Sequence, residues 1–267
     1  MQVPSYRTLA SLAVAVAVAA AVGFAARALF GRHASASRAG LGGARSAAAG
    51  APGSPGERGP GGSAIEEVVL HVPHLAGAIT LDGDTDDPGW TQPPGPARTG
   101  PFTLANGAEA RPYSDARMLW GDGHLYLALY ASDEDIRTRT TDPDGPLWLD
   151  DSFRVAFRRG DVEYVIEVSP KGVVTDSVRR GAGGAYDYSW SSGVHVSPEL
   201  DGTINKHEDM DEEWVIEMAL PFESIGMKGE PGETVGIAIR RCDEPKGQPR
   251  ICGAWGEGDV RARLVLD

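Results

Sequence analysis

Residues 114–131, which read SDARMLWGDGHLYLALYA, decide the fold. Two short runs rich in apolar and aromatic residues, 114–120 and 124–131, flank the tripeptide Gly121-Asp122-Gly123. Glycine and aspartate tolerate the positive φ angles that a tight turn between paired strands requires. The stretch therefore predicts a β-hairpin.

The same two-residue period continues after the hairpin. In residues 152–158 (SFRVAFR), the aromatic and aliphatic side chains of Phe153, Val155 and Phe157 fall on one face. A Gly-Asp turn then leads into residues 162–168 (VEYVIEV). Further strands are expected at 173–178, 214–220, 235–240 and 263–266.

Helices are expected to be short. Glycine and proline punctuate the intervals between strands, and no stretch after residue 65 keeps a helical stripe beyond about one turn. Short helical turns are expected at 87–90 and 222–225. The pattern predicts an all-β domain, an antiparallel β-sandwich or jelly roll.

Residues 1–33 are expected to form a signal peptide or a membrane anchor. The uncharged run at 8–26 is just long enough to cross a bilayer, although it is mostly Ala and Val. Arginines follow the run at 27, 32 and 38, so the positive-inside rule alone would keep the rest of the chain in the cytoplasm. We nevertheless expect export to the periplasm or cell envelope, either with cleavage or with anchoring by an uncleaved helix, because of the cysteines described below.

A linker is expected at residues 34–63, where 25 of 30 residues are Ala, Gly, Ser or Pro. Such a composition cannot bury enough apolar surface to offset the chain entropy lost on folding. The folded domain is therefore expected at residues 64–267.

The charge balance excludes nucleic acid as a partner. Residues 64–267 contain 19 Lys and Arg against 37 Asp and Glu, a net charge of -18, whereas the whole chain carries -13. Binding to DNA or RNA needs Lys and Arg to replace phosphate counterions. Membrane contact is expected only through the N-terminal segment, and the protein is expected to be a monomer.

The chain contains two cysteines, Cys242 and Cys252, in the Gly- and Pro-rich stretch RCDEPKGQPRICGAWGEG. Two cysteines that close a short loop favour a disulfide in an exported chain. A metal site would need two further ligands, and the nearest histidine, His207, is remote in sequence. The disulfide is favoured over free or metal-bound thiols.

Carboxylates are clustered in several loops: 82–87, 133–135, 150–151 and 209–213. Glycoside hydrolysis needs two carboxylates at a defined separation, which the sequence does not reveal. Structural calcium also takes clustered loop carboxylates, but the run DGDTDD lacks the glycine and terminal glutamate of an EF-hand loop. Calcium is consistent with these clusters, whereas nothing in them supports catalysis.

A series of motifs appears in a recognisable order: LDGDTDDPGW (81–90), LWGDGHLYLALYASDEDI (119–136), WLDDSFRVAF (148–157), WVIEMALPFESIG (214–226) and VGIAIRRCD (235–243). Together they resemble carbohydrate-binding module family 9 and the wider group of DOMON-like sandwiches, over about residues 79–267. The stretch DGTINKHEDMDEEW (201–214) is similar to exported bacterial members. The resemblance implies a β-sandwich that binds sugars as an accessory to glycoside hydrolases, with calcium in some members.

The resemblance also implies site residues. Family members hold a terminal sugar between two tryptophans, which by motif match Trp148 and Trp255. An aromatic plate covers the apolar C–H face of a pyranose while polar groups bind its hydroxyls. The alternative is that Trp148 packs a loop onto the sandwich and Trp255 shields the disulfide.

The chain departs from the family pattern where the hydroxyl-binding residues are expected. Arg154 stands where sugar-binding members have an acidic residue, the next strand offers Val165 and Ile166 in place of an arginine, and Gly253-Ala254 replaces an asparagine. Nearby polar residues could substitute: Asp150, Asp151, Arg240, Glu257 and Asp259.

The sequence thus predicts a non-catalytic domain that binds an oligo- or polysaccharide and contributes to carbohydrate catabolism. The alternative is a structural or protein-interaction sandwich without a sugar site. A glycoside hydrolase is less well supported. A haem-binding domain is also less well supported. Some DOMON-like relatives ligate haem through a methionine, but Met218 alternates with expected core residues, which favours a core role for it.

Overall fold

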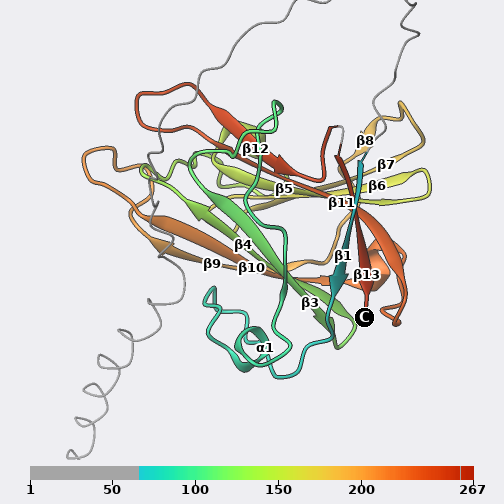
Figure 1. Ribbon diagram of the computed structural model, residues 1–267. Helices are drawn as coiled ribbons and strands as arrows, with labels where there is room; N and C mark the ends of the chain where they lie inside the picture. The colour runs from blue at the N-terminus through green and yellow to red at the C-terminus, as the bar shows by residue number, and fades with distance from the viewer. Residues whose placement is uncertain (1–65, 259) are drawn as a thin grey trace, which may run out of the picture. The chain divides into compact units, whose positions relative to one another are not determined.

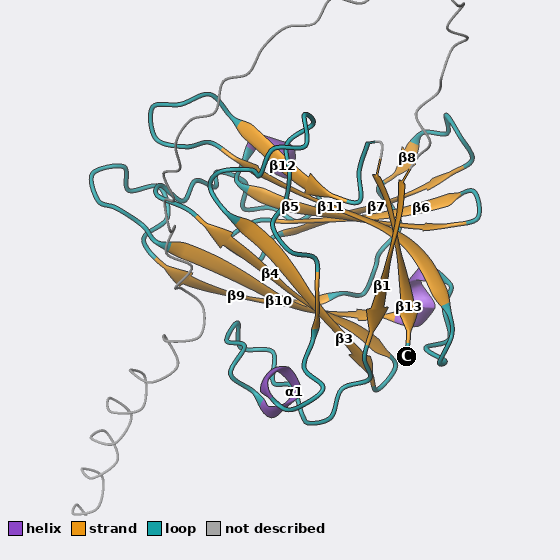
Figure 2. Ribbon diagram, viewed as in Figure 1, coloured by secondary structure: helices purple, strands orange, loops and turns teal. Residues whose placement is uncertain are grey.

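The computed structural model describes residues 66–258 and 260–267, which form two β-sheets packed face to face (Figures 1 and 2). The all-β sandwich expected from the sequence is therefore confirmed. The expected N-terminal segment (1–33) and linker (34–63) lie outside the described residues. Among the residues that are described, no helix is both long enough and apolar enough to span a membrane.

The larger sheet has eight strands. Seven of them lie in the order β1-β13-β11-β5-β6-β7-β8, and β12 pairs with β11 beyond the end of β13. The bounds are β1 (Glu66–Val72), β5 (Ser152–Arg159), β6 (Val162–Val168), β7 (Val174–Arg180), β8 (Tyr186–Asp187), β11 (Thr234–Asp243), β12 (Ile251–Trp255) and β13 (Val260–Leu266).

The smaller sheet has five strands in the order β2-β3-β4-β10-β9. The bounds are β2 (Ala97–Arg98), β3 (Ser114–Gly121), β4 (His124–Ser132), β9 (His195–Asp201) and β10 (Glu213–Pro221). The predicted hairpin is β3 and β4, and its turn residues Asp122 and Gly123 have φ angles of 49° and 78°. Positive φ at both positions is the geometry of a type I′ turn, which explains the Asp-Gly pair.

One pairing departs from the antiparallel expectation, because β1 runs parallel to β13. Parallel neighbours need a long crossover connection. Here the two strands come from opposite ends of the domain, so the intervening chain provides that connection.

The hydrophobic core lies between the sheets. Alternate residues of both sheets meet there, and Trp214 of β10 contacts Phe153 of β5 with ring centroids 4.9 Å apart. Met218 is 1% exposed within the same core, as its alternation with Trp214 predicts. Burial of these side chains is the main favourable contribution to folding.

Among the described residues the helices are single turns. The sequence predicts α1 (Pro88–Thr91) and η3 (Phe222–Ile225), whereas η2 (Leu147–Leu149) was not expected. The segment before α1 is anchored by Glu217, whose carboxylate accepts hydrogen bonds from the Trp90 indole at 2.8 Å and from the backbone N–H groups of Asp82 and Gly83 at 3.1 Å. Burial raises the pKa of this carboxyl although the three donors oppose the shift. The acidic run at 82–87 is thus held against the smaller sheet by a buried acceptor.

Candidate functional site

A groove of about 710 Å³ lies at the edge of the sandwich where the β4–β5 and β11–β12 connections meet. The β11–β12 connection consists of turns and irregular backbone, and the β4–β5 connection adds one short helical segment, because proline, glycine and polar residues interrupt the strand pattern there. The groove is lined by Arg139, Thr140, Thr141, Asp142, Gly145, Pro146, Trp148, Leu149, Asp150, Glu244, Gln248, Pro249 and Arg250.

Trp148 presents its indole to this groove. It lies on η2, which is fixed by the fully buried Leu147 and by a backbone hydrogen bond from Asp150 to the Leu147 carbonyl at 3.0 Å. With Leu147 turned inward, Trp148 and Leu149 project outward and are 54% and 56% exposed. A large aromatic side chain left exposed at a concave site offers an apolar surface to a ligand.

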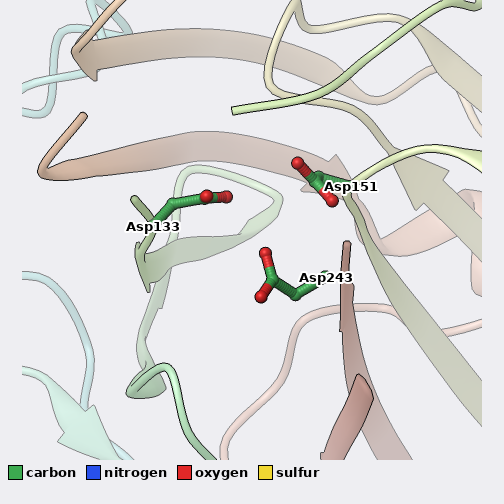
Figure 3. Close-up of side chains that lie close together, drawn as sticks. All are labelled: Asp133, Asp151 and Asp243. Carbon is green, nitrogen blue, oxygen red and sulfur yellow. The ribbon is translucent and has the colours of Figure 1, made fainter. Parts of the chain in front are cut away.

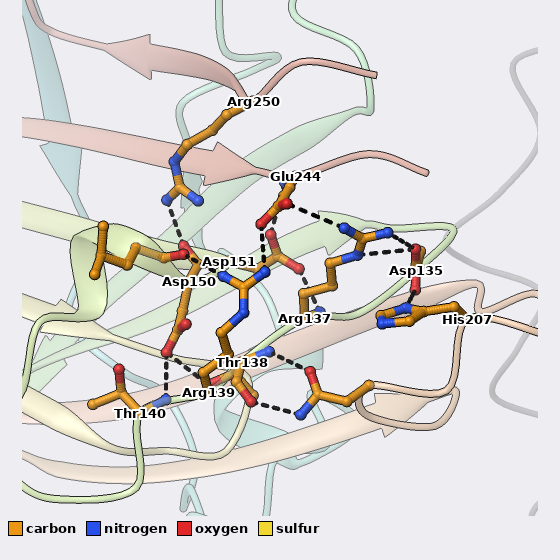
Figure 4. A network of polar contacts seen from close by, with 12 residues as sticks. Asp135, Arg137, Thr138, Arg139, Thr140, Asp150, Asp151, His207, Glu244 and Arg250 are labelled. Atoms are coloured by element: carbon orange, nitrogen blue, oxygen red, sulfur yellow. Dashed lines mark hydrogen bonds and ion pairs between the residues drawn. The ribbon is translucent and has the colours of Figure 1, made fainter. Parts of the chain in front are cut away.

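Asp150 supports the groove from below. Its Oδ2 accepts hydrogen bonds from the Thr140 backbone N–H at 2.8 Å and the Thr138 hydroxyl at 3.2 Å (Figure 4). Burial alone would raise the pKa of this carboxyl, but these donors hold it below its usual value. The second carboxylate oxygen, Oδ1, is buried without a partner among the residues described. As a carboxylate, Asp150 therefore ties the C-terminal end of η2 to the earlier part of the same β4–β5 connection.

An ion-pair network forms one side of the groove. Arg139 donates to Glu244 at 3.0 Å and to the Leu149 carbonyl at 3.2 Å, and Glu244 also accepts from Arg137 at 3.1 Å (Figure 4). Burial would raise the pKa of Glu244, but the two arginines hold it below its usual value. Arg250 donates to the Asp150 carbonyl. The network joins the two connections that enclose the groove.

Two polar side chains of the groove are not engaged in this network. Asp142 and Gln248 are exposed, and neither side chain makes a hydrogen bond to another residue in the part of the chain that the structure describes. A carboxylate and an amide in these positions can accept from and donate to hydroxyl groups of a ligand.

The disulfide expected from the sequence is present. Cys242 of β11 and Cys252 of β12 are directly opposed in the antiparallel pair, with Cα atoms 4.2 Å apart, and form an S–S bond. The loop that they close carries Glu244 and Gln248. Closing a loop of this length stabilises a fold by about 3 kcal/mol in the chain-entropy description. The disulfide thereby restricts one wall of the groove.

The side chain of Asp151 points away from the groove, unlike that of Asp150, and is fully buried. Its two carboxylate oxygens accept the backbone N–H groups of Arg137 at 2.6 Å and Glu244 at 2.8 Å. Burial and the charge of Asp133 raise the pKa of Asp151 to about 7. With no exposed surface, Asp151 lies out of reach of a ligand in the groove.

Asp151 belongs to a buried carboxylate triad with Asp133 and Asp243, whose oxygens approach within 4.8 Å of one another (Figure 3). These three residues are the buried acidic cluster that could take a calcium ion among the described residues. Arg241 lies against it, however, with its Nη2 at 2.8 Å from both Asp133 and Asp243. Burial raises the pKa of Asp243 to about 7 although Arg241 opposes the shift.

The triad does not suit calcium as its side chains stand. The Arg241 guanidinium already donates to the Asp133 and Asp243 oxygens. A calcium ion bound by the same oxygens would therefore lie next to that positive charge. Arg241 is 3% exposed, so its guanidinium is buried together with these oxygens. Repulsion between buried like charges at such separations costs several kcal/mol. The guanidinium already supplies a positive charge where a calcium ion would be placed.

Three other residues that the sequence suggested for sugar binding, Trp255, Arg240 and Glu257, lie outside the groove. Trp255 is half-buried, directly opposite Ile239, and packs against the main core. Arg240 points to the outer face of the larger sheet and pairs with Glu257 at 2.6 Å. Asp259 lies outside the described residues, and the structure brings together Trp148 and Asp150.

Several groove residues were not anticipated from the sequence, notably Arg139, Asp142, Glu244 and Gln248. The signal that could have pointed to Glu244 and Gln248 is their position inside the loop that the two cysteines close. For Arg139 and Asp142 the signal is their place in the turn-rich stretch before Trp148.

Solved structures of carbohydrate-binding proteins share this fold. A candidate carbohydrate-binding protein from Bacteroides uniformis ATCC 8492 superposes with a TM-score of 0.57 at 15% identity, covering 74% of this chain and 99% of that one. A family 9 carbohydrate-binding module from Caldicellulosiruptor kristjanssonii, in complex with cellotriose, gives 0.51 at 13% identity, with coverage of 75% and 94%. The same kind of module from that organism in complex with glucose gives 0.50 at 14% identity, with coverage of 74% and 95%.

These matches confirm, at the level of the fold, the resemblance to carbohydrate-binding module family 9. No protein-family model matches the sequence, and neither does any curated protein.

Proposed function

We propose that this domain is a non-catalytic module that binds a saccharide against Trp148. The observation that carries the proposal is the indole, more than half exposed in a groove of about 710 Å³ whose other lining residues include charged, amide and hydroxyl side chains. Sugars present an apolar C–H face and a polar edge, and a site with one aromatic plate and a few hydrogen-bonding groups matches both.

Different groups around the indole contact different parts of the sugar. The sugar ring stacks on Trp148, and its hydroxyls bond to Asp142 and Gln248, whose side chains are free to reorient. Arg139 and Glu244 are held by their mutual ion pair, so they offer fixed donors and acceptors without an ordering cost when the ligand binds. The fold shared with proteins solved in complex with cellotriose and glucose supports a saccharide ligand.

The pKa shifts of two groove carboxyls, Asp150 and Glu244, support binding without hydrolysis. A glycosidase needs one carboxylic acid whose pKa is raised so that it can protonate the leaving group. The pKa values of Asp150 and Glu244 are both lowered, by hydrogen bonds from Thr140 and by the arginines. Neither residue is suited to act as the general acid.

The test is a calorimetric and Trp-fluorescence titration of the purified chain with glucose, cello-oligosaccharides, xylo-oligosaccharides and peptidoglycan fragments. Trp148→Ala should weaken the affinity at least about tenfold, because stacking and apolar contact are lost together. Since the indole is largely exposed, the free energy of unfolding should change by less than about 1 kcal/mol.

Tyr188→Ala is the matched control, because Tyr188 is also exposed (48%) but lies outside the groove. It should leave the affinity unchanged. Binding that survives in Trp148→Ala would contradict the proposed site. No binding to any sugar by a protein with a cooperative melting transition would favour the alternative of an interaction domain.

We also propose that the domain works outside the cytoplasm as an accessory to polysaccharide breakdown. The disulfide supports this proposal, because such bonds persist mainly in oxidising compartments. Cell fractionation combined with thiol alkylation should find the chain oxidised in the envelope or secreted fraction. A reduced chain in the cytoplasmic fraction would contradict export.

A further inference from the structure

The outer face of the larger sheet, opposite the core, carries a second concave site that the proposed function does not use. Strand alternation places Val155, Phe157, Ile237 and Ile239 in the core, so the residues between them face outward. Four of these outward residues are small and lie side by side across four strands: Ala238, Ala156, Val165 and Ser177. All four are buried, at 4% exposure or less.

Long charged side chains flank this row of small residues on both sides. The register places Arg240, Arg154 and Glu167 on one side and Arg158, Glu163 and Arg179 on the other. The long side chains of the two rows cover these small residues and line a trough on the outer face of the sheet. Its volume is about 400 Å³, and residues of both rows line it.

Among the described residues of the trough and its flanking rows, four arginines (Arg154, Arg158, Arg179 and Arg240) face three carboxylates (Glu163, Glu167 and Glu257). Glu163 serves two of them, accepting from Arg179 at 2.7 Å and from Arg158 at 3.1 Å. Glu257 accepts from Arg240 at 2.6 and 2.9 Å. Glu167 is the remaining carboxylate, and burial raises its pKa although the charges of Arg154 and Arg240 oppose the shift.

Arg154 is therefore the least compensated cation. Its guanidinium lies 3.6 Å from Glu167 and makes one hydrogen bond, to the Tyr186 hydroxyl at 3.2 Å, among the described residues. It also stands directly opposite Arg240 on the neighbouring strand. Like charges in directly opposed positions destabilise a sheet, so an anion held between these two arginines would relieve an unfavourable contact.

We propose that the trough binds the carboxylate of an acidic sugar, a hexuronate, through Arg154 and Arg240. Arginine presents paired N–H groups that match a carboxylate in shape. The surplus of one positive charge matches the single charge of a carboxylate. A phosphate dianion would bring a second negative charge close to Glu163, Glu167 and Glu257. The Glu and Tyr186 oxygens of the walls can accept hydrogen bonds from the sugar hydroxyls.

The choice of a sugar as the ligand rests on the proposed function. The site itself does not, since none of the residues lining the trough lines the Trp148 groove. The two sites can therefore be tested apart. Affinities of the purified full chain are measured by calorimetry for glucuronate and galacturonate and for their oligomers. Glucose and galactose are the matched neutral sugars, and acetate is the carboxylate without a sugar.

Wild type should bind the uronates more tightly than the neutral sugars or acetate, and added salt should weaken that preference. Arg154→Gln should reduce uronate affinity at least about tenfold, a loss of one charge-assisted contact. Arg154→Lys keeps the charge and should lose less. Arg111→Gln, which removes the same charge from a 70% exposed side chain elsewhere, should have no effect.

The outcomes separate this inference from the proposed function. Uronate binding that falls in Arg154→Gln but persists in Trp148→Ala supports the trough as a distinct site. Uronate binding that falls only in Trp148→Ala overturns the trough and leaves the groove standing, as does binding of neutral sugars alone. Uronate binding equal to that of acetate overturns the sugar part of the inference. A melting curve for each variant shows whether it is folded.

Discussion

Arg241 is the counter-ion of the buried carboxylate triad, and its replacement should destabilise the fold. In wild type its Nη2 lies 2.8 Å from Asp133 and from Asp243, and the side chain is 3% exposed. Arg241→Leu would keep an apolar stem, although a shorter one, and would remove the only cation that these carboxylates contact in the described part of the chain.

The size of the effect follows from what is left behind. Removing one partner of a buried ion pair strands the other charge and costs about 3–5 kcal/mol. For a domain of this size each kcal/mol lowers the melting temperature by about 2–4 °C, so a loss of roughly 10 °C is expected. Calcium should then restore part of the loss, because the vacated space borders three carboxylates whose oxygens lie within 4.8 Å of one another.

The assay is thermal unfolding followed by circular dichroism, in EDTA and in millimolar calcium. Wild type should melt at the same temperature in both, whereas Arg241→Leu should melt lower in EDTA and higher with calcium. The double variant Arg241→Leu/Asp243→Asn is the control, because it lacks a triad carboxylate and should lose the calcium response. A higher melting temperature of wild type in calcium than in EDTA, lost in the Asp243→Asn variant, would show that the triad binds calcium beside Arg241 and would refute the reasoning.

Two further predictions concern buried carboxylates outside the triad. Glu217→Gln should destabilise the fold by about 1–3 kcal/mol, measured by urea unfolding, because an amide cannot accept from Trp90 and from the two backbone donors at once. Glu163→Gln should lower the melting temperature at neutral pH, since burial alone would raise the pKa of Glu163 but Tyr186 and Arg179 help to hold it below 4.5. This stabilisation is present above pH 4.5 and is lost as the pH falls through the lower folded-state pKa, so the gap between wild type and variant should close in acid. A gap that is constant between pH 3 and 7 would contradict the pKa direction.

Local sequence was sufficient for the strands because their alternation is imposed by a buried face. Phe153, Val155 and Phe157 recur at every second position, and only a half-buried strand produces that period. The same reasoning could have found Arg241. In VGIAIRRCD the apolar residues at 237 and 239 set the inward phase, so the next inward position falls on an arginine. A charged residue in core phase requires buried partners.

The groove could not be predicted in the same way, because its two walls come from connections about a hundred residues apart. Arg139 and Glu244 meet at 3.0 Å only because β11 lies beside β5 in the larger sheet. Register between distant strands depends on the whole set of pairings and not on any local pattern. The exposure of Trp148 was equally undetermined, since a tryptophan beside a strand packs inward more often than it remains open to solvent.

Asp150 and Asp151 show how little separates a residue that lines the groove from one in the interior. They are adjacent in WLDDSF, yet Asp150 closes the connection beneath the groove while Asp151 enters the triad. Strand β5 begins only at Ser152, so the alternation that orients its residues does not extend back to this pair. Their directions are set instead by backbone donors: the Thr140 N–H group holds Asp150, and that of Glu244 holds Asp151. Because Glu244 donates its backbone N–H to Asp151 and also pairs with Arg139 at the rim, it links the triad to the groove. A substitution at Asp151 would therefore disturb the groove although Asp151 does not line it, which is why the affinity test rests on Trp148.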